Sequence, residues 1–269
     1  MKKQKKDRKK LLKYLEQEDV DQEKKNMRAF FESHCFEMVP YFWMDETHYS
    51  DIEVFFDDAR KLHYVDWHGR RMYWKKGVRP WMIKKGVHAL MQEQDNRSPH
   101  KYVLDDSIDG AYLADFGAAE GCFALDVIER VQHVYLFECD EGWIQSLRAT
   151  FAPWEDKVTI VNKFIGNRVD SDMTTIDAFF ADKPLDYVKA DIEGAEIDML
   201  RGGRETFLNK IRTANLCVYH RPTDSDEIQT ILREYGFECQ LTKGYLFVQQ
   251  EQTEPQNWFR RGVVLGRRK

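Results

Sequence analysis

The sequence predicts an α/β protein whose core is a Rossmann-like, mainly parallel sheet. From about Asp109 onward, short apolar runs with the character of strands alternate with helical stretches. The first run leads directly into a turn that contains Gly117 and Gly121, and the second run ends in Glu138. Alternation of strands and helices is typical of a parallel sheet that is covered by helices on both faces. In such sheets, ligands bind at the carboxyl ends of the strands.

We expect the strands of this sheet at residues 111–116, 133–138, 157–162, 185–190 and 213–219, where apolar side chains are grouped. After these, the pattern changes. Three more apolar runs follow at residues 237–241, 245–249 and 262–265, and no long helix is expected between one run and the next. We therefore expect an antiparallel hairpin to close one edge of the sheet.

The first hundred residues lack this alternation. They predict helices around residues 8–32 and 50–62. The segment 63–74 alternates aromatic and polar side chains around His68 and Gly69, which predicts a small hairpin. This part of the chain therefore has the character of a separate N-terminal extension.

The contrast divides the chain into a cap or docking region, residues 1–108, and a cofactor-binding catalytic domain, residues 109–269. Aromatic side chains are dense in the first region, and we expect them to form a small satellite core. A platform on which a carbohydrate stacks is the alternative. The side chains in question are Tyr41, Phe42, Trp43, Trp67, Trp74 and Trp81.

Composition indicates a folded protein without a membrane span. Of 269 residues, 42% are hydrophobic and 32% are charged, as in ordinary globular domains. No apolar run approaches the roughly 18 residues that a membrane helix needs. The basic N-terminus is not followed by the apolar stretch of a secretory signal, so we expect a cytoplasmic protein. The five cysteines are scattered without a Cys-x-x-Cys pair, which argues against disulfides or a zinc site.

Charge is unevenly distributed. Residues 1–13 hold eight Lys or Arg and one Asp, a net charge of +7, so the rest of the chain carries −12 of the total of −5. An acidic body is a poor surface for nucleic acid, and we expect no specific nucleic-acid partner. We interpret the basic segment as the solvent-exposed beginning of a helix. The alternative is that it binds an anionic surface of a partner.

The turn after the first strand predicts a nucleoside site. Gly117 and Gly121 allow close approach of the backbone, and Ala119 is small. Glu138 lies 21 residues after Gly117, which suits hydrogen bonds to a ribose diol. Asp115 adds a negative charge that favours a cationic ligand such as S-adenosylmethionine over a pyrophosphate. A turn that uses small residues only for packing, and a dinucleotide site, remain alternatives.

Carboxylates are crowded at the end of the fourth strand, where Asp191, Glu193 and Glu196 lie within six positions. Such crowding needs a positive partner, either a sulfonium or a divalent metal such as Mg²⁺ or Ca²⁺. Glu196 also suits the start of a helix. We favour catalytic roles for Asp191 and Glu193, with Asp191 also contacting the cofactor. A metal is the alternative that we do not favour.

The fifth strand ends in His220, whose ordinary pKa near neutrality suits a general base that takes a proton from a hydroxyl. A histidine that only makes structural hydrogen bonds at the strand end is the alternative. Arg221 next to it suits either an anionic substrate or a neighbouring carboxylate.

Four segments together resemble the FkbM family of class I S-adenosylmethionine-dependent methyltransferases. The most specific is Asp191–Glu196, DIEGAE, and the others are ADFGAAEGCF at 114–123, LFECD at 136–140 and CVYHR at 217–221. The resemblance extends over residues 93 to about 235. It includes the segment Glu93–His100, EQDNRSPH, which precedes the first strand.

This resemblance implies S-adenosylmethionine as cofactor and methylation of a hydroxyl oxygen on a sugar, a glycan precursor or a natural product. Surface polysaccharide modification is the expected setting. The implied cofactor contacts are Asp115, Gly117, Gly121 and Glu138, with Gln94 and Ser98 from the preceding segment. Ala119 departs from the family pattern where a second glycine is common, but its side chain is small enough for binding to survive.

Two other function classes stay open. One is a nucleotide-dependent oxidoreductase, which Asp115 disfavours. The other is a non-catalytic module that keeps the methyltransferase fold, against which the retained Asp191, Glu193 and His220 argue. The sequence specifies neither the acceptor nor the oligomeric state.

Overall fold

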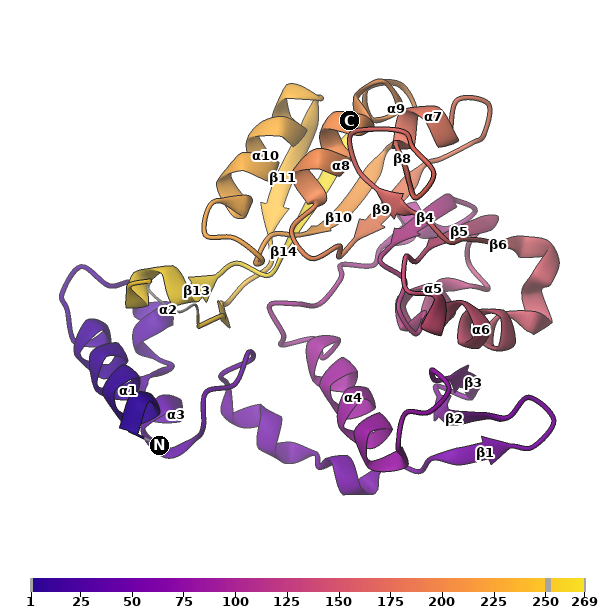
Figure 1. Cartoon of the computed structure of the whole chain (residues 1–269). Coiled ribbons are helices and arrows are strands. Elements are labelled where there is room, and N and C mark those ends of the chain that lie inside the picture. Colours follow the sequence, from indigo (N-terminus) through magenta and orange to yellow (C-terminus); the bar gives the residue numbers. More distant parts are fainter. Residues whose placement is uncertain (1, 250–252, 269) are drawn as a thin grey trace.

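A seven-stranded sheet forms the centre of the protein, in a computed structural model that describes residues 2–249 and 253–268. The strand order is β11-β14-β10-β9-β4-β5-β6 (Figure 1). The bounds of these strands are β4 Tyr112–Phe116, β5 His133–Phe137, β6 Val158–Val161, β9 Tyr187–Ala190, β10 Thr213–Cys217, β11 Phe237–Leu241 and β14 Val263–Arg268.

Strand directions confirm the predicted mainly parallel sheet with an antiparallel edge. The pairs β4–β5, β5–β6, β4–β9 and β9–β10 are parallel, whereas β14 runs antiparallel to both β10 and β11. The chain leaves β4 toward β6 and then returns to β9 on the other side of β4. Strand order therefore reverses between β4 and β9, which is the place where open α/β sheets bind ligands.

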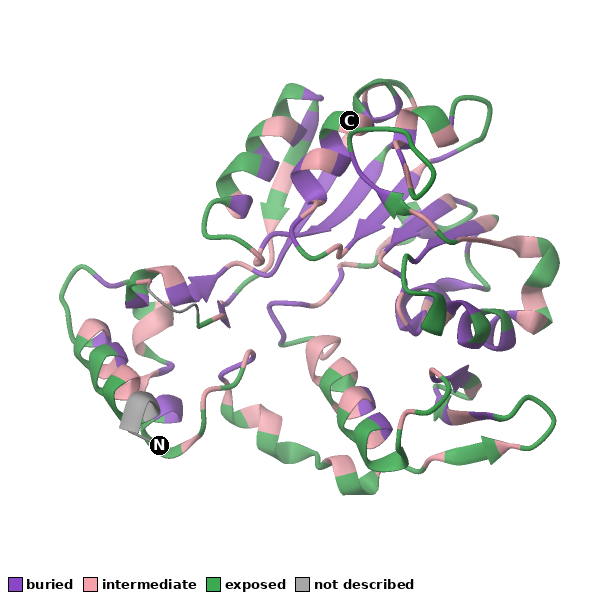
Figure 2. Cartoon of the chain, viewed as in Figure 1, coloured by how far each residue is buried: buried purple, intermediate pink, exposed green. Residues whose placement is uncertain are grey.

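Helices cover both faces of the sheet because successive strand residues point to opposite faces. Leu113 of β4 belongs to a core with α4, α5 and α6, whereas its neighbour Ala114 belongs to a core with α7, α8, α9 and α10. Figure 2 shows the buried strands between these layers. The helices are α4 Pro80–Glu93, α5 Cys122–Val127, α6 Glu141–Thr150, α7 Ile176–Phe179, α8 Glu196–Gly202, α9 Arg204–Asn209 and α10 Asp224–Glu234.

Three short helices and a two-stranded pair form a satellite lobe with its own core (Figure 1). Leu11, Phe30 and Phe31 from the beginning of the chain pack against Phe247 and Trp258 from its last part. The lobe consists of α1 Lys2–Leu15, α2 Gln22–Lys25, α3 Arg28–Ser33, β12 Leu246–Phe247 and β13 Phe259–Arg260. The predicted apolar run 245–249 therefore does not join the central sheet, because its aromatic side chain is buried against these helices.

The predicted helix at residues 50–62 is wrong. Strand β1 (Phe55–Asp57) lies there and pairs antiparallel with β2 (Leu62–Trp67). Asp57 stabilises the turn between them, because its Oδ1 accepts hydrogen bonds from the amides of Ala59 and Arg60, both at 3.0 Å.

The hairpin predicted in residues 63–74 is confirmed, with β3 (Arg70–Tyr73) paired to β2. Its turn residues His68 and Gly69 have φ of +52° and +82°, as a tight hairpin turn requires. Helix α4, which was not predicted, begins at a proline and buries Ile83 and Val87.

The predicted aromatic satellite core is not one cluster. Trp67 and Trp74 are buried in the main core, and Tyr41 packs against the satellite lobe. Phe42 and Trp81 are about half exposed, at 52% and 47%. The aromatic residues of the N-terminal region thus lie in three different surroundings: the main core, the satellite lobe and the exposed surface.

The remaining short elements are β7 Phe164–Ile165, β8 Met173–Thr174 and single 3₁₀ turns at Phe42–Glu46, Tyr49–Asp51, Asp106–Ile108, Ala152–Lys157 and Pro255–Trp258. Within residues 2–249 and 253–268, none of the helices combines the length and the apolar character needed to span a bilayer.

Candidate active site

A pocket of about 360 Å³ opens at the carboxyl ends of β4, β5, β6 and β9, where strand order reverses. Five residues that the sequence singled out line it, namely Gly117, Ala119, Glu138, Asp191 and Glu193. Its other walls include the side chains of Cys139, Asp140, Trp143, Lys163, Phe164 and Ile165. We call this hollow the donor pocket.

The turn after β4 is shaped for close approach of backbone. Gly117 has φ of +75°, and a Cβ there would lie 2.0 Å from the carbonyl oxygen of Asp191. Gly121 has φ of +84°, and a Cβ there would lie 2.7 Å from the ring of Phe151. Both positions therefore require glycine, although only Gly117 lines the donor pocket. Ala119 also lies in the left-handed region, at φ of +47°.

Glu138 is held rigidly at the end of β5. Its Oε2 accepts a hydrogen bond from the Ala119 amide, and its Oε1 accepts one from the Asp140 amide, each at 2.8 Å. The side chain of Asn162 donates to its carbonyl oxygen at 2.8 Å. Each carboxylate oxygen keeps a second lone pair, so Glu138 can still accept hydrogen bonds from a diol in the donor pocket.

Asp115 has a different position from the one the sequence suggested. Its side chain is buried, and its Oδ1 lies 2.9 Å from Nζ of Lys189. Burial raises the pKa of Asp115, and the Lys189 ammonium works against that rise. Lys189 also donates to the carbonyl oxygen of Gly117 at 2.9 Å. Asp115 therefore does not present an open charge to a ligand, and a direct contact with the cofactor stays a prediction.

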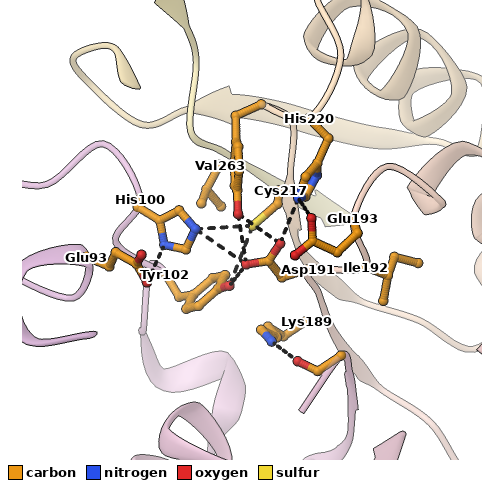
Figure 3. A network of polar contacts seen from close by, with 12 residues as sticks. Glu93, His100, Tyr102, Lys189, Asp191, Ile192, Glu193, Cys217, His220 and Val263 are labelled. Carbon is orange, nitrogen blue, oxygen red and sulfur yellow. Dashed lines mark hydrogen bonds and ion pairs between the residues drawn. The ribbon is translucent and has the colours of Figure 1, made fainter. Parts of the chain in front are cut away.

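Asp191 is the centre of a polar network at the end of β9 (Figure 3). The hydroxyls of Tyr219 and Tyr102 donate to its carboxylate at 3.1 and 3.2 Å. Nε2 of His100 lies 3.4 Å from one oxygen, and Nε2 of His220 lies 3.3 Å from the other. Burial raises the pKa of Asp191, but the two histidines outweigh it and hold that pKa well below its usual range. Asp191 is therefore a permanent anion on the pocket wall.

His220 lies between two carboxylates. Its Nε2 faces Asp191, and its Nδ1 lies 3.3 Å from Oε1 of Glu196. Burial lowers the pKa of His220, but Asp191 and Glu196 outweigh it and raise that pKa to about 10. A histidine that is protonated at neutral pH does not accept another proton. The geometry thus favours a positioning cation over the general base that the sequence suggested.

The loop between β9 and α8 separates the two other acids. Glu196 is buried, and its Oε1 accepts a hydrogen bond from the Ile192 amide at 2.9 Å. Glu193 is the opposite case, because its side chain is 94% exposed at the pocket and its φ is +55°. Strained backbone at a pocket is often retained for function. Glu193 is therefore an accessible carboxylate of the site.

His100 and Tyr102 were missed as functional residues. They come from the segment before β4, in which no role had been predicted for either residue. Gln94 and Ser98 support that segment instead of lining the donor pocket. The Tyr102 amide donates to Oε1 of Gln94 at 3.4 Å, and the His100 amide donates to Oγ of Ser98 at 3.1 Å.

Two overlapping groups in the described part of the chain bring metal-ligating atoms within 4.8 Å of one another. They are His100 with Asp191 and Cys217, and Asp191 with Glu196 and His220. In the second group, the imidazole ring itself faces both carboxylates, so histidine supplies the positive charge there. Action without a metal stays a prediction.

Comparison with known proteins gives a family match. Residues 141–239 match the family model described as the methyltransferase FkbM domain. No curated protein sequence matches the chain significantly.

Solved structures include similar proteins. A methyltransferase FkbM from Methylobacillus flagellatus KT is 20% identical, with a TM-score of 0.47, over 65% of this chain and 47% of that one. Magnesium protoporphyrin IX methyltransferase from Synechocystis PCC 6803, solved with S-adenosylmethionine, is 13% identical with a TM-score of 0.46, over 72% of this chain and 86% of that one. Precorrin-6y C5,15-methyltransferase from Geobacter metallireducens GS-15 is 11% identical with a TM-score of 0.41, over 60% of this chain and 81% of that one.

The match of this chain thus spans about half the length of the first of these proteins. Residues 141–239 of the chain are therefore similar to the methyltransferase FkbM domain.

Proposed function

We propose that this chain transfers the methyl group of S-adenosylmethionine to a hydroxyl oxygen of a sugar, a glycan precursor or a natural product. The observation that carries the proposal is the donor pocket, where Glu138 and Asp191 flank the glycine turn at the point of strand reversal. Two carboxylates there suit a nucleoside with a positive charge and repel a pyrophosphate. The same observation disfavours a dinucleotide-dependent oxidoreductase.

The residues present fit this cofactor. Glu138 is held by two amides with lone pairs to spare, which suits a ribose diol. Asp191 is a permanent anion, which suits a sulfonium. Gly117 leaves room beside the backbone of Asp191 where any other residue would clash.

S-adenosylmethionine supplies a methyl group that its sulfonium already activates, so the protein needs only to align the acceptor, exclude water and receive a proton. Alignment contributes roughly 7 kcal/mol or more in well-oriented cases. We assign proton uptake to Glu193, which has a highly exposed carboxylate at the pocket, whereas Asp140 there is paired with Lys75. A carboxylate suffices as base because the hydroxyl becomes strongly acidic as its oxygen gains the methyl group. His220, as a cation, fixes Asp191 and Glu196.

We propose that residues 109–269 form the donor-binding domain and that residues 1–108 act as its cap, with one amendment. Residues 246–249 and 253–260 belong with the satellite lobe, because Phe247 and Trp258 pack against its helices. The exposed ring of Trp81 lies close to Arg79 and Lys85, whose charged groups are 5.4 and 5.3 Å from its centre. A stacking ring beside two cations suits a sugar that carries an acidic group.

We place the reaction in the cytoplasm. All five cysteines are free, which suits a reducing compartment.

Calorimetric titration with S-adenosylmethionine, NAD⁺ and NADH in turn tests the donor. We expect saturable one-site binding of S-adenosylmethionine alone, weakened in Glu138→Gln and unchanged in Glu141→Gln, a neighbouring exposed acid. Binding of a dinucleotide in place of S-adenosylmethionine overturns the proposal. Incubation with a panel of neutral and acidic glycans and labelled donor then tests methyl transfer. Binding without transfer to any hydroxyl compound supports the non-catalytic alternative.

A further inference from the structure

The first turn of α6 forms one wall of the donor pocket. Asp140, which caps this helix, and Trp143 both line the pocket. Oδ1 of Asp140 accepts a hydrogen bond from the Gly142 amide at 2.7 Å, and the Asp140 amide donates to Oε1 of Glu138 at 2.8 Å. The position of this turn therefore determines the position of two pocket residues and of one amide that holds Glu138.

Lys75 binds this turn from the N-terminal region of the chain. It follows the β hairpin closely, since β3 ends at Tyr73. Its Nζ forms an ion pair with Oδ2 of Asp140 and lies 4.8 Å from the centre of the Trp143 ring. The Lys75 ammonium and the Gly142 amide together hold the pKa of Asp140 below its usual range. One cation thus contacts both pocket residues of the turn.

The two residues before Lys75 also pack against α6. Trp74 is buried, and its ring centre lies 5.5 Å from that of Trp143 at an interplanar angle of 61°. Tyr73 is tied to the other end of the helix, because its amide donates to Oγ1 of Thr150 at 2.9 Å. Three successive residues of the N-terminal region therefore contact both ends of α6.

Two glycines within helices leave room for these side chains. A Cβ on Gly142 of α6 would lie 2.9 Å from Cδ of Lys75, and a Cβ on Gly86 of α4 would lie 2.5 Å from Cη2 of Trp74. Neither glycine has a positive φ that would require it. Because glycine within a helix is less favourable than alanine, the close approach of Lys75 and Trp74 accounts for both glycines.

We propose that Lys75 is a positioning residue of the donor site, which holds Asp140 and Trp143 in the arrangement that binds S-adenosylmethionine. The N-terminal region thereby completes the donor pocket. The inference rests on the proposed function, because it concerns the same donor. Without Lys75, Asp140 loses its ion pair and Trp143 loses the cation beside its ring. Binding must then order this wall of the pocket, which lowers the affinity.

Titration calorimetry with S-adenosylmethionine tests this role in variants of the full chain. Lys75→Met keeps an unbranched apolar side chain but removes the charge. We expect its dissociation constant to rise by roughly fivefold to tenfold, from the combined loss of an ion pair and a cation–π contact. Lys75→Arg keeps the charge and should restore most of the affinity. The matched control is Lys76→Met, which removes the charge of the exposed neighbour and should bind like the wild type.

Gly142→Ala separates positioning from stability. Alanine favours the helix, so a purely structural role predicts unchanged or higher stability in urea and unchanged donor binding. The positioning role predicts weaker binding, because the new Cβ would lie 2.9 Å from both Cδ of Lys75 and Oδ1 of Asp140 and would disturb their ion pair. If Lys75 acts through Asp140, Lys75→Met combined with Asp140→Asn should lose less affinity than the sum of the two single losses.

The outcomes separate this inference from the proposed function. Binding of S-adenosylmethionine to Lys75→Met with wild-type affinity overturns the role of Lys75 and leaves the donor assignment standing. A loss of affinity that Lys75→Arg does not restore, or that Lys76→Met shares, overturns that role too. Absence of S-adenosylmethionine binding to the wild type overturns both. Urea unfolding of each variant should change little, because Lys75 and Asp140 are 29% and 49% exposed.

Discussion

Lys189 and Asp115 lie directly opposite each other on the neighbouring strands β9 and β4, and their side chains form an ion pair of 2.9 Å. Both side chains are almost fully buried, at 6% and 1% exposed. Because Lys189 also holds the carbonyl oxygen of Gly117, the pair joins the two central strands to the turn of the donor pocket. Removal of one partner leaves the other charge without compensation.

Asp115→Ala is therefore expected to lower the free energy of unfolding by about 3–5 kcal/mol, since Lys189 then stays buried and unpaired. Urea unfolding measures this change. The matched control is Asp58→Ala, which removes an exposed partner of Lys61 and should change stability by less than about 0.5 kcal/mol. The double variant Asp115→Leu with Lys189→Met should recover part of the loss, and a double variant less stable than Asp115→Ala would contradict this account.

Gly117→Ala is expected to lower S-adenosylmethionine affinity by at least about tenfold, because the new Cβ would displace the backbone of Asp191. Gly110→Ala is the matched control. Its φ is also positive, at +69°, but a Cβ there meets nothing within 4 Å. Both variants introduce a similar backbone strain, so titration calorimetry should find weakened S-adenosylmethionine binding only for Gly117→Ala. Equal affinities would show that the turn does not shape the donor pocket.

Glu138→Gln should raise the dissociation constant for S-adenosylmethionine by roughly 10- to 100-fold, which corresponds to the loss of about 1.5–3 kcal/mol from charged hydrogen bonds. The amide nitrogen of the glutamine also conflicts with one of the two backbone amides that now donate to the carboxylate. Adenosine, which keeps the ribose diol, should lose affinity by a similar factor. If adenosine binds both proteins equally, Glu138 does not contact the ribose.

His220→Gln tests whether His220 is a positioning cation. The pKa of His220 is raised to about 10 in the folded protein, so its contribution to stability is fully present below about pH 6.5 and is lost as pH rises through 10. The difference in unfolding free energy between wild type and His220→Gln should therefore shrink across that range. Turnover of the wild type should show no ionisation of this histidine near pH 6.5. A limb there that His220→Gln removes would restore the general-base role.

The sequence allowed prediction of the parallel strands and of several residues that line the pocket at their carboxyl ends, because both depend on local patterns. Buried strands such as β5, which is apolar from residue 134 to 137, are short continuous apolar runs, and Gly117 and Glu138 follow strand ends. The error at residues 50–62 has a local cause too. A turn stabilised by Asp57 separates two strands where apolar spacing alone suggested one helix.

The surroundings of the charged residues could not be predicted in this way. Tyr102 donates a hydrogen bond to Asp191, which lies 89 positions later in the sequence. Lys189 forms an ion pair with Asp115 on the neighbouring strand. Such pairings depend on the order of the strands in the sheet, which cannot be read directly from the sequence. They place Asp115 in a buried ion pair and His220 between two carboxylates, two surroundings that residue type alone left open.

The composition of the satellite lobe also determines when its core can form during translation. Leu11, Phe30 and Phe31 leave the ribosome more than two hundred residues before Phe247 and Trp258, against which they pack. Strand β14 (Val263–Arg268) lies between β10 and β11 inside the sheet. The apolar side chains of the first helices therefore have no complete core to pack into until Phe247 and Trp258 have been synthesised.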